Sequence, residues 1–149
     1  MHLAHANAAL MLTSYDDPRM ADFVAELDPV NATADSSPGF VWRLDGDKVD
    51  FDIDEEAARI FGIENLLFNM SVWESVDALE QYTYKSNHID VVRKRAKWFE
   101  KPTRSPFVLW WVEPGHLPSI AEAKSRFDAL WRDGPSREAF TFANRYPPA

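Results

Sequence analysis

The feature that most constrains the fold of this chain is residues 69–98, where the pattern of a strand passes directly into that of a helix. Residues 69–73 alternate polar and apolar side chains, as a strand with two different faces does. A turn follows at residues 74–75, and residues 76–99 are predicted to form a long helix. Such a run can place polar and aromatic side chains on the inside of a sheet, beneath a helix that carries a titratable ring.

Apolar runs and helical periodicities alternate along the rest of the chain. Strands are predicted at residues 3–12, 40–44, 66–73, 107–112 and 140–142. Helices are predicted at residues 16–34, 55–61, 76–99 and 119–133. The short second helix lies in an acidic, irregular stretch, residues 47–65, which looks like an insertion. The order predicts an α+β fold with a ferredoxin-like split βαβ sheet, followed by an extra C-terminal helix and strand.

Length and composition are those of a globular protein. The 149 residues are expected to form a single domain, residues 1–149. The net charge of -8 disfavours nucleic acid as a partner, because an acidic protein repels phosphate. The lack of cysteine excludes disulfides and thiolate metal sites. No signal peptide and no run of about 18 apolar residues is seen, so we expect a cytoplasmic protein with no membrane partner.

Short motifs carry a resemblance to a known family. They are residues 38–43 (PGFVWR), 69–75 (NMSVWES), 97–99 (KWF) and 109–116 (LWWVEPGH). With these motifs the chain resembles the DUF3291 family over nearly its whole length. Over residues 71–79 and 86–88 it also resembles antibiotic-biosynthesis-monooxygenase-type domains. The resemblance implies a dimeric α+β barrel, in which two ferredoxin-like sheets close across a two-fold axis, and therefore a homodimer.

The third predicted strand has one polar and one apolar face, because side chains two apart point the same way. Asn69, Ser71 and Trp73 share a face that we expect to line the barrel interior. Met70 and Val72 share the other face, which suits packing under helices. An amide, a hydroxyl and an indole together could hold a phenol or quinone. Alternatively, Trp73 is a core anchor and Asn69 bonds to backbone at a strand end.

The long helix carries the candidate base. Tyr84, His88 and Arg95 are spaced to share one helical face, where they could lie over the pocket. A neutral histidine with a pKa near ~6.5 is suited to take a phenolic proton. The alternative is a half-exposed histidine bonded to backbone or to a carboxylate. Residues 93–97 form a basic cluster, which either steers an anionic ligand or is a solvated helix face; Arg95 and Arg43 are the arginines most expected to turn inward.

Two adjacent tryptophans occupy the fourth predicted strand. Trp110 and Trp111 should point to opposite faces, one into the barrel interior and the other toward the helices. The inward one could stack on a planar ligand, and the alternative is that both belong to the core. The chain holds 6 Trp, more than a core of this size needs because each buried indole N–H must find a partner, so some should line a pocket or a subunit interface.

The histidines show no metal-site spacing, and the chain lacks the motifs of a phosphate-binding loop and a nucleophile elbow. No metal and no cofactor are therefore expected. His5 could still meet His116 or His88 in space, which leaves haem as an open alternative.

These features suggest an enzyme of small-molecule chemistry. The resemblance implies a cofactor-independent monooxygenase acting on a planar aromatic or polyketide-type phenol, whose anion reacts with oxygen. His88 would act as the base, with Tyr84 or Asn69 holding the oxyanion. The residues expected to bind the substrate are Trp73, Ser71, Arg43, Trp110, Trp111 and Arg95. The alternatives are a non-catalytic small-molecule- or haem-binding dimer, and a cyclase or isomerase that uses the same pocket.

Overall fold

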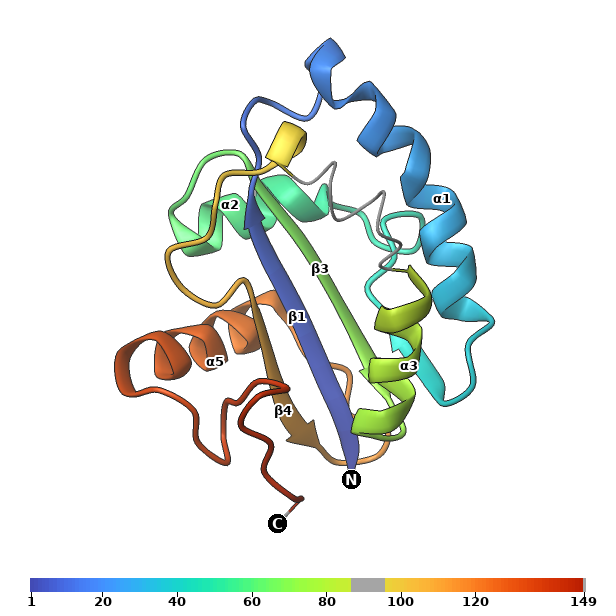
Figure 1. Ribbon diagram of the computed structural model, residues 1–149, viewed down its shortest axis with the longest axis vertical. Coiled ribbons are helices and arrows are strands. Elements are labelled where there is room, and N and C mark those ends of the chain that lie inside the picture. The colour runs from blue at the N-terminus through green and yellow to red at the C-terminus, as the bar shows by residue number, and fades with distance from the viewer. Residues whose placement is uncertain (87–95, 149) are drawn as a thin grey trace.

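The computed structural model describes residues 1–86 and 96–148, and its centre is a four-stranded antiparallel sheet. The strands are β1 (His2–Leu10), β2 (Phe40–Arg43), β3 (Leu66–Trp73) and β4 (Phe107–Val112). Their order in the sheet is β2-β3-β1-β4, so β1 and β3 are the central strands (Figure 1). This is the order of a split βαβ sheet, and the predicted α+β class is confirmed.

Helices precede and follow these strands. The described helices are α1 (Ala21–Asp35), α2 (Ile53–Phe61), α3 (Val76–Ser86) and α5 (Ile120–Asp133), together with a 3-10 turn, η1 (Pro18–Met20). Asp17 caps η1 by accepting the backbone N–H of Arg19, and α1 then runs through Pro29 to its end. None of the described helices is long and apolar enough to cross a membrane.

Capping residues set where two of the helices begin. Ser119 accepts the backbone N–H of Glu122, so α5 starts where the sequence predicts. Asp52 accepts the backbone N–H of Glu55 in the same way, and α2 therefore begins earlier than the predicted residue 55. α2 ends at Phe61, and the next residue, Gly62, caps it with a φ of 69°, in the left-handed region that glycine adopts without strain.

Two predicted elements differ from the structure or extend beyond it. α3 is the first part of the helix predicted at residues 76–99, and residues 87–95 lie outside the described residues. The predicted strand at residues 140–142 is reduced to a single bridge. Phe140 exchanges backbone hydrogen bonds of 2.8 and 2.9 Å with Leu109, and the chain then turns back on itself by Asn144.

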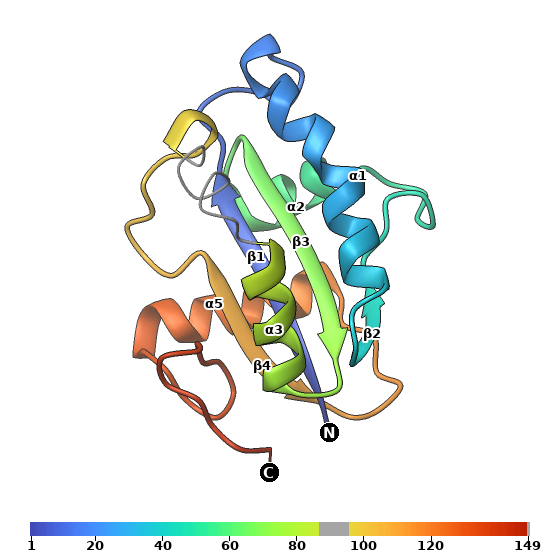
Figure 2. The same cartoon turned by 45° about the vertical axis from the view of Figure 1, so that its right-hand side comes forward.

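Helices cover both faces of the sheet (Figure 1, Figure 2). α1 and α3 lie on one face, called here the front face, and α2 and α5 lie on the other, the back face. The back face carries the main apolar core, in which Phe68, Met70 and Val72 of β3 pack against α2 and α5. Ala4 and Ala6 of β1 are fully buried there, and their small side chains leave room for the larger side chains of the helices.

The front face is where β3 places its polar residues. Met70 and Val72 pack under helices, as predicted, but Asn69, Ser71 and Trp73 face the side of α1 and α3. The expectation that these three line a barrel interior is wrong, because a barrel of two such sheets encloses the face turned away from the crossover helices. That back face is covered by α2 and α5 of the same chain. Within the stretch 47–65, α2 contributes Ala57 and several partly buried apolar side chains to the core on this face.

Candidate functional site

Four polar side chains meet on the front face of the two central strands. Asn7 of β1 stands directly opposite Asn69 of β3, and His5 stands directly opposite Ser71. Side chains directly opposite one another in an antiparallel pair have Cβ atoms about 5 Å apart, so the four form one compact group. His5, Asn7, Asn69 and Ser71 are called the polar quartet below.

The quartet offers polar atoms that the protein leaves unpaired. Asn69 is exposed although β3 is a central strand, and His5 and Asn7 are only partly buried. Within residues 1–86 and 96–148, no partner hydrogen-bonds to the side chains of these three residues. Polar groups in the middle of a packed sheet face are normally paired within the protein. These donors and acceptors are therefore available to a bound molecule.

An aromatic pair bounds the quartet at one end. The ring of Trp73 stacks on that of Tyr82 in α3, with centroids 5.0 Å apart and planes at 24°. The Nε1–H of Trp73 donates a 2.8 Å hydrogen bond to Ser71 Oγ, which ties the stack to the quartet. Trp73 is fully buried, which favours the anchor interpretation over ligand contact. Tyr82 is partly exposed and supplies the flat wall.

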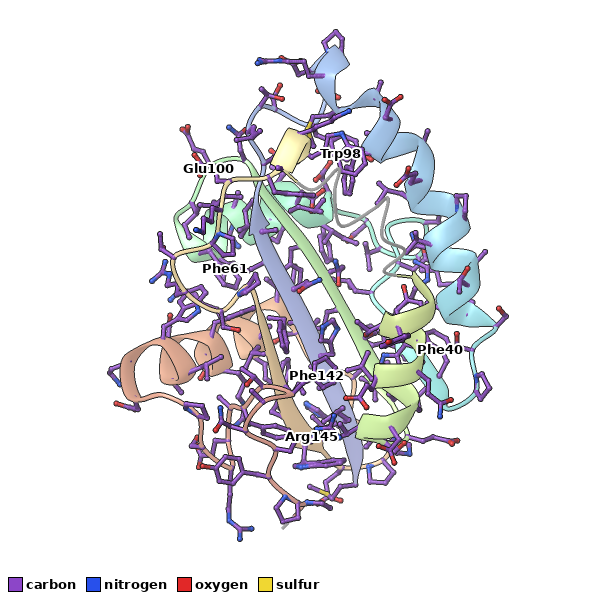
Figure 3. All side chains as sticks on the ribbon, in the orientation of Figure 1. Phe40, Phe61, Trp98, Glu100, Phe142 and Arg145 are labelled. Atoms are coloured by element: carbon purple, nitrogen blue, oxygen red, sulfur yellow. The ribbon has the colours of Figure 1, made fainter. Side chains whose placement is uncertain are left out.

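Phenylalanines bound the quartet on the side of β4. Phe107 pairs with Asn7, and its ring centroid lies 6.1 Å from that of His5. Phe142, from the C-terminal segment, packs on Phe107 at 5.3 Å. Figure 3 shows Phe142 and Arg145 in front of the sheet, on the side of α3. The C-terminal segment thus encloses the site on this side.

His5 is the titratable member of the quartet. Burial lowers its pKa from 6.5 to about 4, so the imidazole is neutral at neutral pH and one ring nitrogen can accept a proton. Sequence reasoning considered His5 only as a partner for other histidines. The alternation of Leu3, His5 and Asn7 in β1 carried the signal, but only the register with β3 shows that His5 joins Ser71.

α3 turns Tyr82, not Tyr84, toward the sheet. Leu79 is fully buried, and Tyr82 follows it by three positions on the same helical face. Tyr84 is 87% exposed, so the prediction that it lies over the site is wrong. Helical spacing puts Tyr84 on one face with His88, but the face that packs on the sheet is the apolar one that Leu79 marks. His88 and Arg95 lie outside the described residues.

Arg43 lies on the front face in register with Ser71, and its side chain is only 20% exposed. Its Nε donates a 2.8 Å hydrogen bond to Asp35, and its Nη2 lies 3.4 Å from Asp45. The bond to Asp35 raises the pKa of the guanidinium. The charge of Arg43 is therefore compensated, and the residue ties β2 to the end of α1 instead of presenting a free cation to a ligand.

The adjacent tryptophans of β4 point to opposite faces, and both are anchored. Trp110 is fully buried against α5, and its Nε1–H donates to Glu122 Oε2 over 2.9 Å. Trp111 lies on the front face, where its Nε1–H donates to the backbone oxygen of Tyr146 over 2.8 Å. These contacts favour the core interpretation of both indoles over stacking on a ligand at the quartet.

His5 and His116 do not meet. His116 Nε2 lies 2.7 Å from Glu122 Oε1 of α5, whereas His5 belongs to the front face. No group of three or more histidine, aspartate or glutamate side chains that could hold a metal ion occurs in the part of the chain that the structure describes.

One further carboxyl group is perturbed, away from the quartet. Asp54 Oδ1 of α2 accepts the backbone N–H of Phe68 over 2.9 Å. The β2–β3 pairing ends at Ser71, so the side chain of Asp54 stands where a strand partner would. Burial raises the pKa of Asp54 to about 6, although the hydrogen bond from Phe68 acts to lower it. The sequence does not predict a perturbed pKa for Asp54, because the burial of its side chain depends on how α2 packs against β3.

Comparison with known proteins identifies a family and a structural similarity. The family described as Domain of unknown function (DUF3291) matches residues 2–149. The chain is also similar to SnoaB, described as a cofactor-independent oxygenase from Streptomyces nogalater. The identity is 16%, and the TM-score is 0.45 over 79% of this chain and 98% of that chain. No curated protein matches the chain.

Proposed function

The chain belongs to the DUF3291 family, and because the family's description names no activity, we propose a function from the site itself. We propose a small-molecule enzyme, most nearly a cofactor-independent monooxygenase that acts on a planar aromatic or polyketide-type phenol. The observation that supports it is the polar quartet, open on a central strand at Asn69 and bounded by the ring of Tyr82.

In this proposal the substrate ring lies against Tyr82 with its phenolic oxygen over the quartet. The lowered pKa of His5 keeps its imidazole unprotonated before the substrate binds, so it can accept the phenolic proton. The amide N–H groups of Asn7 and Asn69 then donate to the oxyanion. Although His5 is a weak base when alone, the substrate anion that forms beside it favours the protonated ring.

The oxidation needs no cofactor, because the substrate anion supplies the electrons. One electron passes from the anion to O2, and the resulting carbon radical and superoxide combine to a peroxide anion at that carbon. This anion takes back the proton held by His5 and becomes a hydroperoxide. Loss of water then leaves a carbonyl group. Overall, the reaction consumes one CH2 group and one O2 and forms one C=O group and one water. The protein makes the anion and holds it.

Oxygen uptake with a panel of anthrone-type phenols tests the proposal. We expect turnover by the wild type, a loss in kcat/KM of about 100-fold or more in His5→Gln, and a similar loss in Asn69→Ala. His88→Ala tests the base predicted from the sequence. His116→Gln, beside α5, is the matched control and should keep full activity. Absence of turnover on every phenol, or full activity in both quartet variants, would refute the proposal.

A second candidate is a non-catalytic dimer that binds a small molecule or haem. The neutral imidazole of His5 favours it, because an iron ligand must be unprotonated. Titration with haem should then give a shifted Soret band that His5→Gln abolishes. A cyclase or isomerase using the same site would instead convert the phenol without consuming oxygen. Light scattering tests the homodimer, which is part of both proposals.

A further inference from the structure

Most arginines of this acidic chain have a charged or aromatic partner. Those paired with carboxylates are Arg19, Arg43, Arg59, Arg132 and Arg145. Arg104 lies over the ring of Trp131, 3.8 Å from its centroid. Among the described residues, Arg126 and Arg137 are the arginines left with neither kind of partner. In a protein of net charge -8, two uncompensated guanidinium groups call for an explanation.

Both of these arginines line the same cavity. Its volume is about 270 Å³, and its lining residues come from β4, α5, the C-terminal segment and Met1. Its apolar lining includes Trp110, Trp111 and Pro147, and its one acidic residue is Glu138. Glu138 lies beyond ion-pair distance of both arginines. The cavity therefore combines two cationic groups with indole surface.

The contacts of the lining residues define what a ligand would meet. Arg126 Nη1 donates a 3.1 Å hydrogen bond to the backbone oxygen of Glu138, which orients the guanidinium and leaves its other N–H groups unused. Arg137 is exposed and makes no hydrogen bond within the described residues. The Nε1–H of Trp111 is already bonded to the backbone oxygen of Tyr146, so this partly buried indole offers only apolar surface. Trp110 is fully buried and contributes no surface to a ligand.

We propose that this cavity binds a small aromatic carboxylate. Arg126 and Arg137 donate charge-assisted hydrogen bonds to the carboxylate, and the aromatic body lies against Trp111 and Pro147. A volume near the lower limit for ligand pockets suits a ligand of one or two rings. The cavity lies beside α5 and the edge strand β4, whereas the polar quartet lies on the central strands, so the two sites share no lining residue.

Calorimetric titration with 1-naphthoate tests this site, with 1-naphthamide as the neutral analogue of the same shape. We expect saturable binding of the naphthoate and a naphthamide affinity weaker by about tenfold or more. Arg137→Gln, at an exposed position, should weaken naphthoate binding by about tenfold or more, and Arg126→Gln should do the same.

Two controls separate this cavity from other sites. Arg132→Gln removes a neighbouring arginine of α5 that is already paired with Asp133, and it should bind naphthoate like the wild type. Asn69→Ala should also bind normally, because the quartet takes no part. The proposal is overturned if naphthoate shows no saturable binding up to about 10 mM, or if Arg137→Gln binds as tightly as the wild type. It is also overturned if naphthamide binds equally well, or if Asn69→Ala abolishes binding.

Discussion

The substitution Asp54→Asn should stabilise the protein more at neutral pH than in mild acid. The pKa of Asp54 is about 6 in the folded protein and 3.8 as the reference for an unfolded chain. The folded state therefore binds more protons between these values, and the free energy of unfolding falls as the pH rises through this window. Asparagine cannot ionise, yet its amide oxygen can still accept the backbone N–H of Phe68, so the variant keeps the bond and loses the penalty.

The expected change in the free energy of unfolding follows from the two pKa values. Integrating the difference in bound protons from about pH 4.5 to about pH 7.5 gives about 2 kcal/mol lost by the wild type relative to Asp54→Asn. This is an upper value, because water still reaches part of the carboxyl group. With the urea dependence of the unfolding free energy that is typical of a small domain, this energy corresponds to about 1 M urea. The difference between the urea midpoints of wild type and Asp54→Asn should change by that amount over the pH range.

Urea unfolding of both proteins at several pH values measures the effect. The quantity to plot is the wild-type free energy of unfolding minus that of Asp54→Asn, because the pH dependence of all other groups cancels in the difference. Asp22→Asn, which removes an exposed carboxylate from the first turn of α1, is the matched control. A difference for Asp54→Asn that stays flat, or that rises with pH, would show that the carboxyl is not destabilised by burial.

Other consequences of the structure can be measured by the same unfolding assay. His5→Gln should show the opposite pH dependence, because the pKa of His5 is about 4 in the folded protein, below its ordinary value of 6.5. The wild type should lose free energy of unfolding relative to His5→Gln as the pH falls from about 6.5 toward about 4. A difference between the two proteins that does not change with pH contradicts this. Gly39→Ala should cost about 2–4 kcal/mol, because φ is +83° and the new Cβ would lie 2.5 Å from that of Ala78. Gly115→Ala, with φ +89° and no neighbour within 4 Å, should cost only about 1 kcal/mol, and equal losses would exclude the clash. Ser119→Ala should cost about 1 kcal/mol, recovered largely by Thr, since the residue caps α5; no loss would show that the cap is dispensable.

The sequence predicts the strands of the fold better than their surroundings. β3 and β4 have the predicted bounds because each is an apolar or alternating run between turn residues. The prediction of a strand at residues 140–142 is wrong, because only Phe140 pairs with the sheet edge, through a single bridge to Leu109, before the chain turns back. Strand parity separates the two faces of β3 correctly, but it cannot say which helices cover each face. Parity alone therefore does not show that α1 and α3 cover the polar face.

The site depends on information that no single segment contains. Asn69 and Ser71 follow from parity within one strand, whereas Asn7 and His5 join them only through the antiparallel register of β1. Helical spacing alone left the orientation of α3 open. The fully buried Leu79 fixes that orientation and selects Tyr82.

The polar quartet also explains why the back face needs its own helices. An apolar, buried side chain at each position of the quartet would contribute about 1.5–3 kcal/mol to folding. The polar side chains at these positions do not make that contribution. α2 and α5 supply it on the opposite face, where Met70 and Val72 of the same strand are almost fully buried. From Asn69 to Val72, the residues of β3 thus alternate between the proposed chemistry and the back-face core, and Trp73 then returns the front face to core packing. Truncating Val72 should unfold the protein more readily, whereas truncating Asn69 should leave it folded and remove a group available to a ligand.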